Sequence, residues 1–206
     1  MAGMEGGTMD GSRNKGQEIG SGNGNGRRTL VAYYSRTGNV AKVADEVARE
    51  LGADVERIID RKDRRGIRGW LRAGSDSTRR KPADIVEPSR DPAEYDLVII
   101  GSSIWNKTIT TPVRAYMHKF PGRFPRVAFF VNTGFNRYAG AFEELGGLAG
   151  KAPVATLVIH DRELKRGAHL AKIQEFVGQL AGPFPAQTDK TGEANPGIAA
   201  SDEVNA

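Results

Sequence analysis

The sequence predicts an α/β fold built on a doubly wound, five-stranded parallel sheet. Its strand-like segments are continuous apolar runs rather than period-two alternations, which is typical of strands buried on both faces. Segments with helical periodicity alternate with these runs along the chain. Because β–α–β crossovers are right-handed, five such units predict an open sheet with helices on both sides.

The first part of this pattern covers residues 28–60. Residues 28–35, RTLVAYYS, predict a buried strand, and residues 39–52 predict a helix that ends at Gly52. Residues 53–60, ADVERIID, predict a short strand containing Val55 and Ile58. The inner face of the helix is expected to carry Val40, Val43, Ala44, Val47 and Leu51.

The second part begins with a buried strand at 95–105, YDLVIIGSSIW. A helix follows at 111–120, with Thr111 as its cap and Pro112 at its first position, where the missing N–H costs nothing. The remaining elements are a strand at 126–134, a helix at 140–150, a strand at 152–159 and a helix at 167–181. The inner face of the last helix is expected to carry Leu170, Ile173, Phe176, Val177 and Leu180.

Both ends of the chain differ from this pattern. Residues 1–27 are rich in Gly, Asn and Ser and show no period, so we expect a disordered leader. Residues 182–206 are aperiodic and rich in Pro and Gly, so we expect a disordered tail. The expected folded domain is therefore 28–181.

The composition of the chain excludes several classes of reaction and of metal site. The chain contains no cysteine, which excludes disulfides, thiolate nucleophiles and cysteine-ligated metals. It also contains no apolar run of membrane-spanning length, and its first residues lack the pattern of a secretory signal, so we expect a cytoplasmic protein without a transmembrane segment. The three histidines show no metal-ligand spacing, and no metal site is expected.

Basic residues are concentrated in one segment. Residues 61–81 hold nine Lys or Arg and two Asp, a charge of +7, whereas the whole chain carries +5. The same segment contains Ile67, Trp70 and Leu71 at the spacing of a short helix. We interpret the charge as a solvated surface. The alternative is peripheral contact with an acidic redox partner or an anionic membrane surface. No nucleic-acid partner is expected, because Trp70 is the only aromatic platform there.

In an open parallel sheet, ligands bind beyond the carboxyl ends of the strands at the switch point of the strand order. The segments after Tyr34, Ile100 and Val131 are therefore the candidate binding loops.

The first of these loops, SRTGN, crowds Ser35, Thr37, Gly38 and Asn39 at a strand-to-helix junction. Unpaired amides at a helix start, hydroxyl donors and a glycine together can hold a phosphate without a lysine. The simpler alternative is an N-cap, but a cap needs only one such residue.

Aromatic residues follow the other two strands. Trp105 lies in the second loop, GSSIWNKTITTP, where it is either packed on its own domain or serves as a flat wall for an aromatic ring. Phe135 and Tyr138 lie in the third loop, NTGFNRYAG, as anchors of a polar turn or as cover for the ring's other side. A phosphate loop and aromatic walls at one switch point indicate a phosphorylated planar cofactor.

Two stretches, YYSRTGNVAKVADEVARELG and YDLVIIGSSIW with TPVRAYM, resemble the flavodoxin family, whose phosphate loop has the pattern S/T-x-T-G. The resemblance covers about residues 28–181. It implies a flavodoxin-like sheet with strand order 2-1-3-4-5 and FMN as the cofactor.

The resemblance also implies which residues surround FMN. Around the phosphate it places Ser35, Arg36, Thr37, Gly38, Asn39 and Val40. Along one side of the flavin it places Ser102, Ser103, Ile104, Trp105 and Asn106. Along the other side it places Asn132, Thr133, Gly134, Phe135 and Tyr138. Val40 departs from the family's usual hydroxyl residue, and Phe135 departs from its usual small residue.

The loops contain no evident acid–base pair, so we expect no catalytic residue and favour an electron carrier that serves a redox partner protein or a quinone-like acceptor. Familiar carriers of this family are acidic, whereas this chain is basic. The alternative is therefore a flavin-dependent oxidoreductase of the NAD(P)H:quinone or protoporphyrinogen dehydrogenase type.

Overall fold

The computed structural model describes residues 26–61, 83–105, 107–136 and 138–182. The expected leader and tail lie outside these residues, except for residues 26, 27 and 182, and so does the short helix expected around Trp70. Of the predicted leader, Arg27 is described, and its guanidinium donates to the carbonyl oxygens of Leu180 and Gly182. This contact fastens the start of the first strand to the end of the last helix.

The described elements alternate between strands and helices, as the sequence predicts. They are β1 (Thr29–Tyr33), α1 (Asn39–Leu51), β2 (Asp54–Arg57), η1 (Pro92–Glu94), β3 (Leu97–Trp105), β4 (Thr108–Ile109), α3 (Thr111–Lys119), β5 (Val127–Thr133), α4 (Ala139–Ala149), β6 (Thr156–His160), α5 (Asp161–Arg166) and α6 (His169–Ala181).

The sheet has the order β2-β1-β3-β5-β6, and all four of these pairings are parallel. Counted along the chain, these five strands have the predicted order 2-1-3-4-5. The two-residue strand β4 was not predicted; it pairs antiparallel with the end of β3 and adds a sixth strand.

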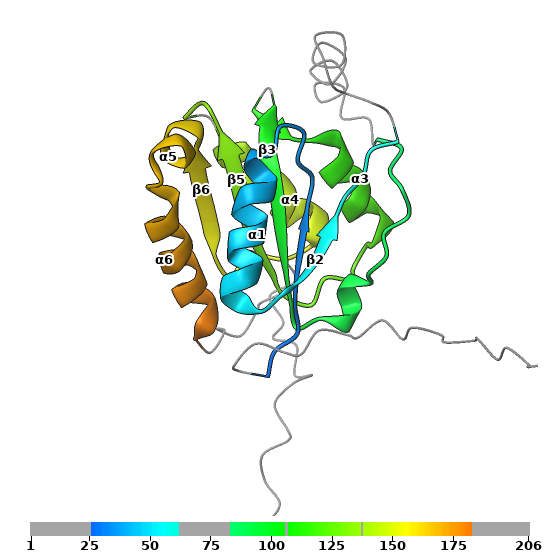
Figure 1. Cartoon of the computed structure of the whole chain (residues 1–206). Coiled ribbons are helices and arrows are strands. Elements are labelled where there is room, and N and C mark those ends of the chain that lie inside the picture. The colour runs from blue at the N-terminus through cyan, green and yellow to red at the C-terminus, as the bar shows by residue number, and fades with distance from the viewer. Residues whose placement is uncertain (1–25, 62–82, 106, 137, 183–206) are drawn as a thin grey trace, which may run out of the picture.

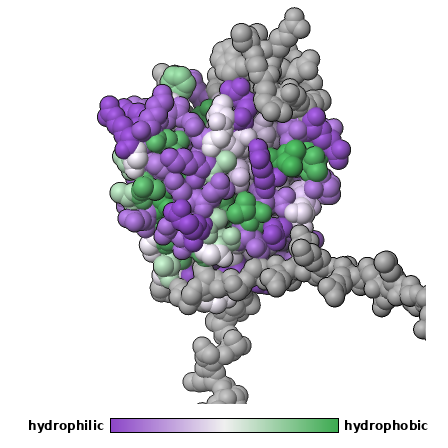
Figure 2. Space-filling model, viewed as in Figure 1, coloured by the Kyte–Doolittle hydropathy of each residue, from purple (hydrophilic) through white to green (hydrophobic). Residues whose placement is uncertain are grey.

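Helices cover both faces of the sheet (Figure 1). On one face, α1 and α6 pack over side chains such as Val31, Ile99 and Phe130. On the other face, α3 and α4 pack over Ile100, Phe129 and their neighbours. The surface seen over α1 and α6 is mainly hydrophilic with small, separate hydrophobic patches, as expected for helices that bury one side only (Figure 2).

The predicted inner face of α1 is confirmed, since Val40, Val43, Ala44, Val47 and Leu51 are all buried. On α6 the prediction of Leu170 is wrong, because this residue is 47% exposed whereas His169 is 1% exposed. The buried positions of α6 are 169, 173, 176 and 180, a spacing of three to four residues that turns Leu170 outward. The buried ring of His169 is tolerated because its Nε2 atom pairs with Glu46 on α1, at 3.1 Å.

The predicted cap of α3 also differs. Thr110, not Thr111, is the N-cap residue, and Pro112 is the second residue of the helix. The hydroxyl of Thr110 does not cap the helix, because it lies 3.2 Å from the Ser102 hydroxyl instead.

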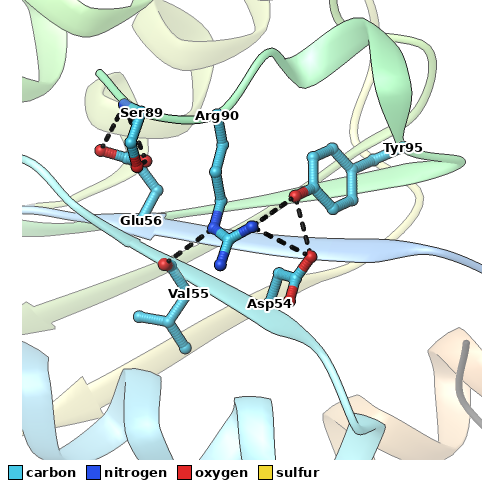
Figure 3. Close-up of polar contacts among 6 residues, drawn as sticks. All are labelled: Asp54, Val55, Glu56, Ser89, Arg90 and Tyr95. Carbon is cyan, nitrogen blue, oxygen red and sulfur yellow. Dashed lines mark hydrogen bonds and ion pairs between the residues drawn. The ribbon is translucent and has the colours of Figure 1, made fainter. Parts of the chain in front are cut away.

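A returning segment covers the open edge of β2. Ile85 forms an antiparallel bridge with Asp60, and the Arg61 amide donates to the Asp84 carbonyl. Further along, Arg90 donates to the Val55 carbonyl (Figure 3). Main-chain groups that an edge strand would otherwise leave unpaired are thus used within the chain.

Burial on β2 is unusual, because Val55 is exposed and Glu56 is buried. The Glu56 carboxylate accepts hydrogen bonds from both the amide and the hydroxyl of Ser89 (Figure 3). Beside it, the Asp54 carboxylate accepts from the Tyr95 hydroxyl. A buried carboxylate is tolerated when its oxygens are satisfied in this way.

One glycine in the sheet is required by packing. A Cβ added at Gly101 would lie 2.1 Å from the Cζ atom of Phe130, which is fully buried and has no room to move. We therefore expect Gly101→Ala to lower the free energy of unfolding by about 1–3 kcal/mol through overpacking. Urea denaturation measures this change.

Gly147 on α4 provides the control, because a Cβ there would meet no atom within 4 Å. Gly147→Ala should stabilise the protein by about 0.5–1 kcal/mol, since alanine replaces glycine in a helix. Equal stability of the Gly101→Ala protein and the wild type would contradict the packing argument.

Candidate functional site

The first loop joins β1 to α1 through residues 34–38. Gly38 has φ 97°, the left-handed region that favours glycine, and its amide donates to the Ser35 hydroxyl at 3.2 Å. Within the described residues, no side chain caps α1 and its first turn holds no acidic residue. The amides that begin α1 and the exposed Thr37 hydroxyl therefore form an electropositive helix start.

The second predicted loop is largely strand. β3 continues to Trp105, so Ser102, Ser103 and Ile104 belong to the sheet rather than to a loop. The strand is longer than its parallel partners because β4 pairs with its last residues. Asn106, which follows β3 in the sequence, lies outside the described residues. Lys107, just before β4, has φ 67°.

Ser102 has a structural role. Its side chain is fully buried, and its hydroxyl accepts a hydrogen bond from the Thr110 amide at 3.1 Å. This bond joins β3 to the chain that returns from β4 into α3. Ser103, by contrast, is half-buried and accepts from the indole Nε1 of Trp105 at 2.9 Å.

A buried ion pair fixes the β3–β4 hairpin to the helices behind it. Arg114 on α3 is 3% exposed and donates through Nε to the carboxylate of Glu144 on α4 at 2.7 Å. The same guanidinium donates to the Thr108 hydroxyl on β4 at 2.9 Å, and that hydroxyl also donates to Glu144. α3, α4 and β4 are therefore connected at the hairpin in which Thr108 pairs with Trp105.

The third loop follows β5, which itself includes Asn132 and Thr133. Both side chains are buried: Asn132 donates to the Ile159 carbonyl on β6, and the Thr133 hydroxyl accepts from the Phe135 amide at 3.0 Å. These bonds shape the turn that presents Phe135, whose side chain is 77% exposed.

Tyr138 lies at the start of α4, as its N-cap residue. Its ring makes edge contacts with Phe142 and His160 at centroid distances of 6.3 and 6.1 Å. Tyr138 is thus held against its own helix and the end of β6.

The first loop contacts the second directly and approaches the third through Asp161, which follows β6. The guanidinium of Arg36 lies over the ring of Trp105, 4.7 Å from its centroid. On the other side, Asn39 donates to the Asp161 carboxylate at 3.0 Å, and a second oxygen of Asp161 lies 3.2 Å from where a Cβ of Gly134 would be. The three predicted segments therefore meet at one edge of the sheet.

Asp161 was not predicted as a site residue. It follows β6 directly, so the rule that ligand-facing residues lie past the carboxyl ends of strands could have identified it. It also begins α5, which was not predicted, and a capping box of His160 and Glu163 starts that helix.

Glu163 fixes the position of Asp161 through this cap. Partial burial opposes ionisation of Glu163, but hydrogen bonds from Lys172 and the His160 amide outweigh it and hold the pKa of its carboxyl below the ordinary value. Glu163 is therefore ionised at neutral pH and continues to accept both bonds.

The predicted residues fall into three groups by exposure. Exposed ones are Thr37, Gly38, Gly134 and Phe135. Half-buried ones are Arg36, Asn39, Ser103, Ile104, Trp105 and Tyr138. Buried ones, which shape the site from beneath, are Ser35, Val40, Ser102, Asn132 and Thr133.

A strand order of 2-1-3-4-5, with three loops meeting where the order reverses beside β1, is the arrangement that defines one class of doubly wound sheet. The chain has a flavodoxin-like fold.

Solved structures share this flavodoxin-like fold at low sequence identity. A protein assigned as a flavoprotein from Bacteroides uniformis matches with a TM-score of 0.64 and 21% identity, over 74% of this chain and 98% of its own. A flavoprotein from Lactobacillus acidophilus, in complex with FMN, matches with a TM-score of 0.57 and 19% identity, over 69% of this chain and 99% of its own. No protein-family model matches the chain, and neither does any curated protein.

In the described part of this flavodoxin-like chain, no helix is long and apolar enough to cross a bilayer.

Of the ion pairs near the site, the Arg114–Glu144 pair should contribute most to the free energy of unfolding. Arg114→Met keeps the aliphatic stem but leaves Glu144, 16% exposed, without its cation. We expect a loss of about 3–5 kcal/mol in the free energy of unfolding, as for other buried pairs broken on one side. Urea denaturation measures the loss.

Arg49 provides the matched control, because its ion pair with Glu50 is exposed, at 68% and 41% of the two side chains. Arg49→Met should cost about 0–1 kcal/mol. Similar small losses for both variants would show that the buried pair does not hold the hairpin.

Proposed function

We propose that this protein binds FMN at the edge where the three loops meet and transfers electrons through it. The observation that carries this proposal is the start of α1: an uncapped helix with hydroxyls on its approach and no acidic residue in its first turn, in contact through Arg36 with Trp105. A phosphate is favoured at such a helix start, and an aromatic ring is favoured beside the indole.

The phosphate fits the first loop for reasons of geometry. Gly38 has no side chain and adopts a left-handed conformation, so the backbone can approach an anion closely. Ser35 accepts the Gly38 amide and holds the loop in shape, while its own hydroxyl hydrogen stays available to a ligand. Thr37 is exposed and can donate directly.

The ring fits between the second and third loops. Trp105 offers an indole held at its edge by Ser103, and Tyr138 and the exposed Phe135 lie on the third loop. Asp161, bonded to Asn39, provides an acceptor between the phosphate loop and the third loop that suits the hydroxyls of a ribityl chain. The proposed FMN-binding set is the predicted one with Asp161 added, and within it Ser102, Asn132 and Thr133 support the loops from beneath through bonds within the chain.

FMN supplies the redox chemistry when bound, so this chain's residues need only bind it, orient it and limit its contact with water. We favour a carrier that exchanges electrons with a redox partner or a quinone-like acceptor. His160, at the end of β6, packs its ring against Tyr138 and is not assigned a role in proton transfer.

We further propose that the protein is located in the cytoplasm.

FMN binding is tested by reconstitution. After incubation with FMN and desalting, the purified protein should retain a flavin absorbance band in a ratio of about one per chain, as expected for a single site whose Kd lies well below the micromolar protein concentration. Loss of all flavin on desalting, at micromolar protein concentration, would contradict the proposal.

The paired variant Ser35→Ala with Thr37→Ala sharpens this test, because it removes both hydroxyls from the phosphate loop. FMN affinity should fall about tenfold or more, which corresponds to roughly 1.4 kcal/mol, while riboflavin affinity should change little. Fluorescence titration of both ligands measures the two affinities. Equal losses for both would mean that the loop does not recognise phosphate.

The second candidate is a flavin-dependent oxidoreductase that uses NAD(P)H and a quinone, or a protoporphyrinogen-type substrate. The net charge of +5 favours it, because familiar carriers of the flavodoxin family are acidic.

The two candidates are separated by steady-state turnover. If the protein is a carrier, FMN-loaded protein with NAD(P)H and a quinone should show no oxidation above the rate of free FMN until a reductase is added. Absorbance at the nicotinamide band follows the reaction. Sustained turnover without a partner reductase would contradict the carrier function and support the oxidoreductase function.

A further inference from the structure

The indole of Trp105 is held on two sides by residues from different parts of the chain. At its edge, Nε1 donates to the Ser103 hydroxyl at 2.9 Å, a contact within β3. On one face, the Arg36 guanidinium lies 4.7 Å from the ring centroid. The edge contact limits rotation of the side chain, and the face contact fixes the plane of the ring.

The backbone delivers Arg36 to this position. β1 pairs in parallel with β3, with Tyr33 opposite Gly101, and the pairing continues one residue further through the Tyr34 amide and the Gly101 carbonyl. The hydrogen bond between Gly38 and Ser35 then closes the loop around Arg36. The start of the Arg36 side chain is therefore fixed relative to β3.

No competing partner holds the guanidinium in the described part of the chain. Its Nε atom is buried and makes no hydrogen bond there. Stacking on Trp105 is the interaction that the structure shows for this group, and a planar guanidinium suits a flat ring better than an ammonium does.

We propose that Arg36 is a positioning residue for the flavin ring: it fixes the plane of Trp105 so that the opposite face of the indole receives the ring. This inference rests on the proposed binding of FMN. The first loop then has two roles, because the segment that binds the phosphate also orients the indole on which the flavin ring stacks. The binding of the two ends of FMN is then coupled through one side chain.

Two other roles for Arg36 make different predictions. As a phosphate ligand only, it would contribute to FMN binding and not to riboflavin binding. As a group that covers the face needed by the flavin, it would weaken the binding of both, and its removal would tighten them. A positioning role requires that its removal weaken both ligands alike.

The binding experiment uses Arg36→Ala and Arg36→Lys, titrated with FMN and with riboflavin. Arg36→Ala should weaken both ligands by a similar factor of about tenfold, comparable to the loss of one strong cation–π contact. Arg36→Lys should recover part of that loss, because it keeps the charge but not the planar group. Loss of FMN binding alone, tighter binding of both ligands, or no change would each overturn the proposal.

A second measurement needs no flavin. The sequence has two tryptophans, Trp70 and Trp105, so a Trp70→Phe background leaves Trp105 as the only indole emitter. In that background, Arg36→Ala should shift the emission of Trp105 to longer wavelength and raise its acrylamide quenching constant, because the face that the guanidinium covered becomes open to solvent. Unchanged emission and quenching would overturn the proposal.

Arg162 is the matched control, an exposed arginine on α5 whose removal takes the same charge from the protein. Arg162→Ala should leave the emission of Trp105 and the riboflavin affinity unchanged, and circular dichroism should show that each variant keeps its helices. If the wild type binds no flavin, the proposed function and this role of Arg36 both fail. If the wild type binds and Arg36→Ala binds equally well, only the positioning role fails.

Discussion

The parallel pairing of β1 with β3 is the constraint on which the rest of the structure depends. β1 is buried on both faces and has a neighbour on each side, and its register with β3 places the end of Tyr33 beside Gly101. Because the strands run in the same direction, the loop after β1 and the end of β3 that carries Trp105 must lie at the same edge of the sheet. On the other side of β3, Phe130 of β5 fills the space that a side chain at position 101 would need. The packing of these buried strands therefore fixes the positions of the loops that form the candidate site.

Much of the fold could be predicted because it follows from local patterns. Continuous apolar strands indicated a parallel sheet, and the periodicity of residues 39–52 identified both the buried face of α1 and its end at Gly52. The errors occur where tertiary hydrogen bonds override a local preference. The N-cap of α3 lies at Thr110 rather than Thr111, and the Thr110 amide and hydroxyl both contact Ser102 on β3. Leu170 yields the inner face of α6 to His169, which pairs with Glu46. No local pattern contains these distant partners.

The site was predicted as three segments, and the structure brings all three together, but the roles of individual residues could not be derived from the sequence. Ser102, Asn132 and Thr133 look like ligand-binding residues in sequence, yet their polar groups are engaged by neighbouring chain segments. Asp161 went unnoticed because it follows the strand to which no binding role was assigned. A motif identifies which edge of a sheet carries a ligand, whereas only packing decides which side chains are free to reach it.

The cover over β2 has a consequence for how this chain can vary. Arg61 and Asp84 are joined by a main-chain hydrogen bond, and Asp60 and Ile85 form a bridge beside it, so the two described segments that flank residues 62–82 are held together in a closed stem. The entropy of closing such a stem rises only slowly with the number of residues inside it. Insertions and deletions between the two halves of the stem therefore leave the sheet unchanged. Proteins of this fold can differ in sequence and function at this position without loss of the folded domain.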